Sequence, residues 1–149
     1  MQQKPFDDFA VGEIFKSYGR TIFDADLQAF TCFAGLKLPI FIDEEFAKKN
    51  TSYGGRIAPG FMTASIAAGM MEDILGPYTL AALGLGDFKF TVPLRPGDTM
   101  HCEIEVLEKR DTSDGKRGIL SSLTRVINQR DEVVLEFKGK FLMRKERLI

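Results

Sequence analysis

The sequence is poor in the residues that build metal centres and disulfide frameworks. Among its 149 residues it has no tryptophan, one histidine (His101) and two cysteines (Cys32 and Cys102). Neither cysteine belongs to a Cys-x-x-Cys pair or stands near a second soft ligand, which argues against a zinc site. We therefore expect no bound metal, and two buried thiols in a reducing cytoplasm.

A surplus of charge is also missing. Twenty basic and 21 acidic residues leave a net charge of -1, so the electropositive surface of a general nucleic-acid binder is not expected. The longest uncharged stretch, residues 57–71, is shorter than the roughly 18 apolar residues of a membrane span, and the acidic start does not resemble a signal peptide. These features predict a cytoplasmic protein that enters no membrane.

Apolar residues make up 44% of the chain and include 13 phenylalanines. A chain of this length and composition can bury a stable core without disulfides or a structural metal. No linker interrupts the pattern, which predicts a single domain over residues 1–149.

The first half of the chain reads as one strand followed by helices. Residues 15–23 have the β-branched and aromatic content of a strand, and Asp24 is a suitable N-cap for a following helix that Gly35 would end. Asp43 is placed to cap a second helix. The stretch 60–75, with Pro59 in its first turn and Gly76-Pro77 after it, is apolar on almost every side, which predicts a helix wrapped by protein.

From Gly86 onward apolar and polar residues alternate with a period of two. The alternation predicts strands around residues 86–92, 100–106, 117–128 and 132–144. One strand, then helices, then four antiparallel strands is an α+β order, which a curved antiparallel sheet around a long apolar central helix would satisfy. This architecture is the hot-dog fold.

Four blocks of the sequence resemble one family, and they occur in that family's order. They are PIFIDEEFAKK, YGGRIAPGFMT, GLGDFKFTVPLRPGDTM and EVLEKRDTSDGKRGI. The chain is similar in these blocks to the MaoC-like (R)-specific enoyl-CoA hydratase/dehydratase family. The resemblance implies a hot-dog fold, a homodimer with a continuous sheet, and a tunnel for an acyl group. Coenzyme A would be part of the ligand, and no separate cofactor is implied.

The family's proton-transfer motif is not retained. Active members carry Asp-x-Asn-Pro-[Ile/Leu]-His, in which the Asp and His activate water and protonate the α-carbon. At the matching positions this chain has Leu36, Leu38 and Phe41, with Pro39 kept. None of the three replacements can move a proton, so the sequence predicts no confident catalytic residue.

The family's second element is a glycine at the start of the central helix, whose N–H polarises the thioester carbonyl. Gly60 matches it, with Pro59 in place of the family's common histidine. Gly55, Arg56, Pro59, Gly60 and Phe41 are therefore the predicted substrate-binding residues. The alternative interpretation of Gly60 is that it only permits close packing at the start of a helix.

Other polar residues have a plain structural interpretation beside the functional one. His101 is expected on the solvent or dimer-contact face of its strand. The acidic residues at helix starts are explained by capping and the helix dipole; they are Asp24, Asp26, Asp43, Glu44 and Glu45. Cations that could meet the phosphates of coenzyme A are Arg56, Lys89 and Arg95, whereas Lys138 and Lys140 alternate on an outer face.

The sequence thus favours a protein that binds acyl thioesters without standard enoyl-CoA hydratase activity, as a homodimer or as the non-catalytic partner of a catalytic hydratase subunit. An alternative is an active hydratase, dehydratase or thioesterase with relocated acid–base residues, of which His101, Asp43 and Glu44 are the first candidates. A third hypothesis is that Phe41 and Leu36 fill the site.

Overall fold

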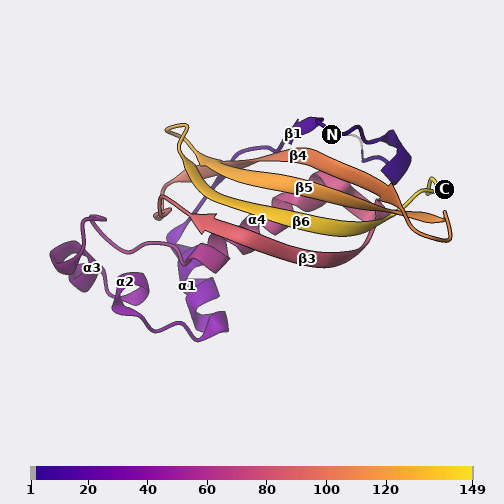
Figure 1. The fold of residues 1–149 in the computed structure, drawn as a ribbon. Helices are drawn as coiled ribbons and strands as arrows, with labels where there is room; N and C mark the ends of the chain where they lie inside the picture. The colour runs from indigo at the N-terminus through magenta and orange to yellow at the C-terminus, as the bar shows by residue number, and fades with distance from the viewer. Residues whose placement is uncertain (1–2, 149) are drawn as a thin grey trace.

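One antiparallel sheet and one long helix dominate the computed structural model, which describes residues 3–148 (Figure 1). The helical elements are η1 (Phe6–Asp8), α1 (Asp24–Ala34), α2 (Pro39–Ile42), α3 (Glu44–Asn50), α4 (Gly60–Leu75) and η2 (Gly76–Tyr78). The strands are β1 (Ile14–Lys16), β2 (Arg20–Thr21), β3 (Thr79–Phe90), β4 (Thr99–Asp111), β5 (Arg117–Asn128) and β6 (Val133–Arg144).

The sheet has the order β1-β4-β5-β6-β3, with β2 also paired to β4, and α4 lies along one of its faces (Figure 1). Alternate residues of β4 to β6 point toward α4 and are buried, among them Met100, Cys102, Leu120, Phe137 and Met143. Their burial makes the sheet and α4 one hydrophobic core. The predicted α+β hot-dog fold is confirmed.

The first strand is shorter and more broken than the sequence predicted. In place of one strand over residues 15–23, β1 and β2 pair separately with β4. The Ser17 side chain interrupts the ladder, since its Oγ accepts the N–H of Cys102 at 2.8 Å. The prediction was wrong because β-propensity does not show that the Ser17 hydroxyl, rather than a backbone carbonyl, accepts the N–H of Cys102.

The start of α1 also differs from the prediction. Asp24 is the first helical residue rather than the cap, and the side chain of Asp26 accepts the N–H of Phe23 at 2.8 Å. The helix ends as predicted, at Gly35 with a left-handed φ of 66°. Cys32 lies on the solvent face of α1 and is exposed, so only Cys102 is the expected buried thiol.

Strand β3 is the far edge of the sheet and begins at Thr79, earlier than the predicted start at Gly86. The sequence hides this because β3 pairs only with β6 and is bulged at several points, so its burial does not alternate. Its exposed side chains include Leu80, Leu83 and Leu85, at 41–52% exposure. Figure 1 shows this long strand without a neighbour on its outer side.

Helix α4 starts after Pro59, which is its N-cap residue rather than part of its first turn. Its inner side is buried, including Met62, Ala67, Met71 and Ile74. One side remains open, with Phe61, Ser65, Ala68 and Glu72 exposed. The single chain thus covers the inner side of the helix only, and the prediction that protein wraps the helix is met on that side. Within residues 3–148, no helix is both long and apolar enough to cross a membrane.

Candidate functional site

The start of α4 presents backbone donors that have no acceptor within the described chain. The first intrahelical bonds come from Met62 and Thr63, whose N–H groups both donate to the carbonyl of Pro59. The N–H groups of Gly60 and Phe61 precede these bonds, and none of residues 3–148 accepts from them. A helix start carries about half a positive charge, so a carbonyl oxygen placed there is stabilised.

Gly60 is packed against an aromatic ring. A Cβ added to Gly60 would lie 2.5 Å from Cε1 of Phe90, a distance that real side chains do not tolerate. Phe90 is 49% exposed, and its ring contacts Phe61 and Phe88. A side chain at this position would require the Phe90 ring to shift, and glycine leaves the helix start open to a ligand.

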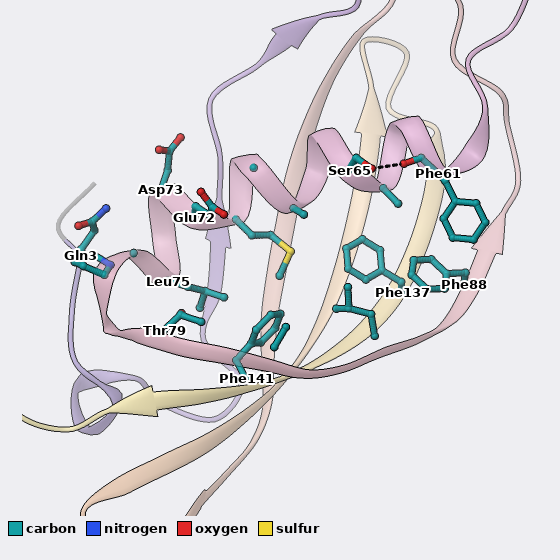
Figure 2. Close-up of a pocket in the computed structure, with 18 residues that line it drawn as sticks. Gln3, Phe61, Ser65, Glu72, Asp73, Leu75, Thr79, Phe88, Phe137 and Phe141 are labelled. Carbon is teal, nitrogen blue, oxygen red and sulfur yellow. Dashed lines mark hydrogen bonds between the residues drawn. The ribbon is translucent and has the colours of Figure 1, made fainter. Parts of the chain in front are cut away.

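A groove of about 980 Å³ runs along α4, between the helix and strands β3 and β6 (Figure 2). Its walls are mostly apolar or small and include Ala64, Ala68, Leu85 and Phe141. The rings of Phe61, Phe88 and Phe137 lie at the end nearest the start of α4, and Gln3, Glu72 and Asp73 lie at the other (Figure 2). The groove can thus hold an apolar chain laid parallel to the helix.

None of the three degenerate motif positions lines the groove. Phe41 is half-buried on α2, Leu36 is half-buried in the preceding turn, and Leu38 is 57% exposed. The carbonyl of Ile40 accepts the N–H of Ile57 at 3.2 Å, which ties α2 to the segment leading to Gly60. The structure thus brings the motif segment toward the start of α4, and the side chains it brings are apolar.

Arg56 serves as a structural tie. Its Nε donates to Oε2 of Glu44 at 3.0 Å, its Nη2 donates to Oδ1 of Asp24 at 2.5 Å, and its N–H donates to Glu44 at 3.1 Å. The backbone and side-chain hydrogen bonds from Arg56 lower the pKa of Glu44. Burial by itself would lower the pKa of Arg56, but the two carboxylates raise it. The positive charge of Arg56 is thus already paired with two carboxylates and is not available to bind a phosphate of coenzyme A.

The other predicted cations also have partners or specific positions. The Arg95 guanidinium lies over Gly54 and Gly55, donating from Nη2 to the carbonyl of Gly54 at 3.0 Å. Its Nε is buried and has no acceptor among residues 3–148. Lys89 pairs with Glu136 at 3.5 Å, and Lys138 pairs with Asp87 at 3.1 Å, away from the groove. Among residues 3–148, the Arg95 guanidinium and the Lys140 ammonium have no carboxylate oxygen within 4.0 Å, unlike the charged groups of Arg56, Lys89 and Lys138.

The proton-transfer candidates lie outside the groove. His101 is on the face of β4 opposite Met100 and Cys102, where it is only 16% exposed and its Nε2 is 3.8 Å from Glu103. Asp43 caps α3 by accepting the N–H of Phe46 at 2.9 Å. Burial raises the pKa of the Cys102 thiol to about 12, which leaves it protonated and unreactive.

Sequence reasoning missed the carboxylates that do line the groove, Glu72 and Asp73. Both lie in the last turn of α4, where negative charge opposes the helix dipole, and this mismatch was the signal available in the sequence. It also missed the shared position of Phe61, Phe88 and Phe90. Their proximity depends on the pairing of β3 with β6, which periodicity does not reveal.

Comparison with known proteins gives consistent matches. Residues 8–126 match the family model described as a MaoC like domain. β-Methylmalyl-CoA dehydratase of Chloroflexus aurantiacus is 30% identical over 143 residues, which are 94% of this chain and 40% of that protein. The chain therefore spans about two fifths of the length of this curated relative.

Solved structures agree with this match. The structure of a monoamine oxidase regulatory protein from Archaeoglobus fulgidus superposes with a TM-score of 0.87 at 32% identity, covering 97% of both chains. The R-hydratase PhaJ1 from Pseudomonas aeruginosa superposes with a TM-score of 0.81 at 28% identity, covering 97% of this chain and 88% of that one.

Proposed function

This chain belongs to the MaoC-like acyl-CoA hydratase/dehydratase family, and on that basis we propose that it binds an acyl-CoA thioester without performing standard hydration. The acyl chain lies in the groove between α4 and β3, and the thioester carbonyl accepts from the N–H groups at the start of α4. Coenzyme A enters as part of the ligand, and the proposal needs no further cofactor.

One observation carries this proposal. The N–H groups of Gly60 and Phe61, which have no acceptor among residues 3–148, lie at the aromatic end of a mostly apolar groove, and Phe61 belongs to both features. A hydrogen-bond donor next to an apolar channel matches a thioester, whose one strong acceptor adjoins a hydrocarbon chain. Phe41, Gly55, Arg56 and Pro59 then support the site from the segments beside Gly60.

Catalysis by the family's mechanism lacks its proton-transfer pair. The motif positions hold Leu36, Leu38 and Phe41. The first groove carboxylate, Glu72, lies twelve residues beyond Gly60 on the same helix, or about 18 Å at 1.5 Å per residue. A side chain so far from the carbonyl is outside hydrogen-bond reach of the reacting atoms.

The alternative is an active hydratase, dehydratase or thioesterase with relocated acid–base residues. The activity named for the Chloroflexus relative, a dehydratase, favours it. In this alternative a titratable group must approach the thioester. His101, Asp43 and Glu44 do not line the groove, so they would have to act from a second subunit or after a rearrangement.

The edge strand β3 supports a proposal about assembly. A twelve-residue edge strand with exposed leucines, and with no strand on its outer side among residues 3–148, is a template for another strand. We expect a second copy to pair with β3 and extend the sheet. A hetero-oligomer with a catalytic hydratase subunit would use the same edge, and this chain would then be the non-catalytic partner.

The test combines binding with turnover. Crotonyl-CoA is titrated into the purified protein in a calorimeter, and the ultraviolet absorbance of its conjugated thioester is followed at high protein concentration. We expect saturable binding and unchanged absorbance. Loss of absorbance that depends on one named titratable group would establish the active alternative, and absence of binding for several acyl-CoAs would overturn the proposed function.

A further inference from the structure

Three phenylalanine rings form an aromatic wall beside the N–H groups at the start of α4 that have no acceptor among residues 3–148; Phe61 and Phe90 are exposed and Phe88 is half-buried. We use aromatic wall for Phe61, Phe88 and Phe90. The rings of Phe88 and Phe90 are stacked, with centroids 6.0 Å apart and an angle of 5° between their planes. The Phe61 ring meets both edge-on, at 5.9 Å and 6.0 Å. The wall is therefore an ordered arrangement rather than three unrelated side chains.

This arrangement is open to solvent in the single chain. Phe61 is 64% exposed and Phe90 is 49% exposed, although large aromatic side chains are usually covered. The wall is joined to the hydrophobic core, because the Phe88 ring also stacks on the buried Phe137 ring, with centroids 5.3 Å apart. An exposed aromatic surface fixed to the core is typical of a binding surface. Because Phe88 and Phe90 belong to β3, a second copy paired with this edge would lie beside the wall.

The aromatic wall lies next to the site proposed for the thioester carbonyl. Phe90 packs directly on Gly60, while Phe61 and Phe88 line the groove at the same end (Figure 2). A carbonyl held by the N–H groups of Gly60 and Phe61 would place the first carbons of the acyl group against these rings. The wall would therefore contact the acyl carbons nearest the thioester, and the rest of the groove would contact their continuation.

We propose that the aromatic wall selects thioesters whose acyl group is planar next to the carbonyl, with an aromatic ring as the preferred class. This inference rests on the proposed function and adds the chemistry of the acyl group to it. Flat rings stack on or meet the edges of Phe61 and Phe90, whereas a puckered saturated ring of similar size has no π face and fits the flat surface less well.

The test compares benzoyl-CoA with cyclohexanecarbonyl-CoA, which carry rings of six carbons and differ in planarity and π character. Dissociation constants are measured by calorimetry on the full chain. Aromatic pairs add about 2- to 12-fold in affinity beyond area burial, so benzoyl-CoA is expected to bind tighter by that factor. The variants F61L and F90L should each reduce this ratio toward one while keeping an apolar side chain.

A matched control is F33L, since Phe33 is 91% exposed on α1 and remote in sequence from the wall; it should leave the ratio unchanged. Equal affinities, or a ratio insensitive to both F61L and F90L, would overturn this inference while acyl-CoA binding stands. Failure of every acyl-CoA to bind would overturn the proposed function as well. If F61L changes the sedimentation mass and not the ratio, the wall covers a second copy and the inference is wrong.

Discussion

Phe6 occupies the space that a side chain on Gly118 would need. A Cβ on Gly118 would overlap the Phe6 ring, which is only 2% exposed and has the Lys109 ammonium 4.7 Å from its centroid. The N-terminal turn thus packs onto β5 only because residue 118 has no side chain. The sequence marks Gly118 as a strand residue but does not show that Phe6 lies over it.

We therefore predict that Gly118→Ala lowers the free energy of unfolding, by about 1–3 kcal/mol as for other overpacked sites. Urea unfolding followed by circular dichroism measures it. Gly69→Ala is the matched control, because nothing lies within 4 Å of a Cβ there, and in a helix interior the change should stabilise by about 0.5–1 kcal/mol. An unaffected Gly118→Ala variant would show that Phe6 does not pack as described.

Glu44 couples the stability of the helical segment to pH. Hydrogen bonds from Arg56 lower its pKa below the ordinary value of 4.5. A carboxylate with a lowered pKa in the folded state stabilises the protein above its unfolded pKa, and this stabilisation is lost as pH falls through the folded pKa.

Glu44→Gln should consequently reduce stability at pH 7, and the difference from the unmodified protein should shrink as pH falls below 4.5. Thermal unfolding across this pH range measures the effect. Glu45→Gln is the control, because Glu45 is 70% exposed and pairs only with lysines at 3.9 Å. A stability difference between Glu44→Gln and the unmodified protein that does not depend on pH would mean that the charge of Glu44 does not contribute to its contact with Arg56.

At the scale of the element, the sequence predicted strands well where one face is buried and poorly where it is not. β4, β5 and β6 alternate because they lie between other strands and under α4, so Met100, Cys102 and Ile104 are buried in turn. β3 has only one neighbour, and its leucines remain exposed on the edge. An edge strand that pairs on one side only and carries several bulges shows no regular alternation that a single sequence could reveal.

The exposed edge of β3 predicts an association that a single charge should disrupt. Leu83 is 52% exposed and does not line the groove. Leu83→Lys should convert a dimer into a monomer, because lysine on an edge strand opposes pairing with a second strand. Sedimentation equilibrium measures the mass. Val11→Lys, at a residue 63% exposed in the N-terminal segment, should leave the dimer intact, and a dimeric Leu83→Lys variant would exclude β3 as the interface.

At the scale of the whole molecule, the blocks that carry the family resemblance identified the fold and the segments around Gly60. They could not reveal the groove, since its walls come from α4, β3, β6 and Gln3, which meet only in the folded chain. Nor could they show that Arg56 is held by Asp24 and Glu44, because that contact joins three separate segments. Residue identities indicated the chemistry, and the tertiary structure determined which of those residues remain available to a ligand.

We predict that the scaffold lacks only the proton-transfer side chains of the family's reaction, and restoring them tests this. Leu36→Asp, Leu38→Asn and Phe41→His together recreate the family's motif in the turn before α2 and on α2, whose Ile40 carbonyl accepts the N–H of Ile57, three residues before Gly60. Positioned general acid–base groups contribute about 10²- to 10⁴-fold. The triple variant should therefore hydrate crotonyl-CoA at least about 10²-fold faster than the unmodified chain, measured by loss of enoyl absorbance.

The matched control carries Leu36→Asn, Leu38→Asn and Phe41→Gln, which add similar polarity without groups that exchange protons near neutral pH. Circular dichroism confirms that both variants fold, a necessary check because Leu36 and Phe41 are half-buried. Hydration by the acid–base variant alone would show that the groove and the N–H groups of α4 already hold the thioester correctly. A folded acid–base variant that binds crotonyl-CoA yet stays inactive would show that α2 does not present these positions to the carbonyl, and the assignment of Gly60 as the polarising donor would then fail.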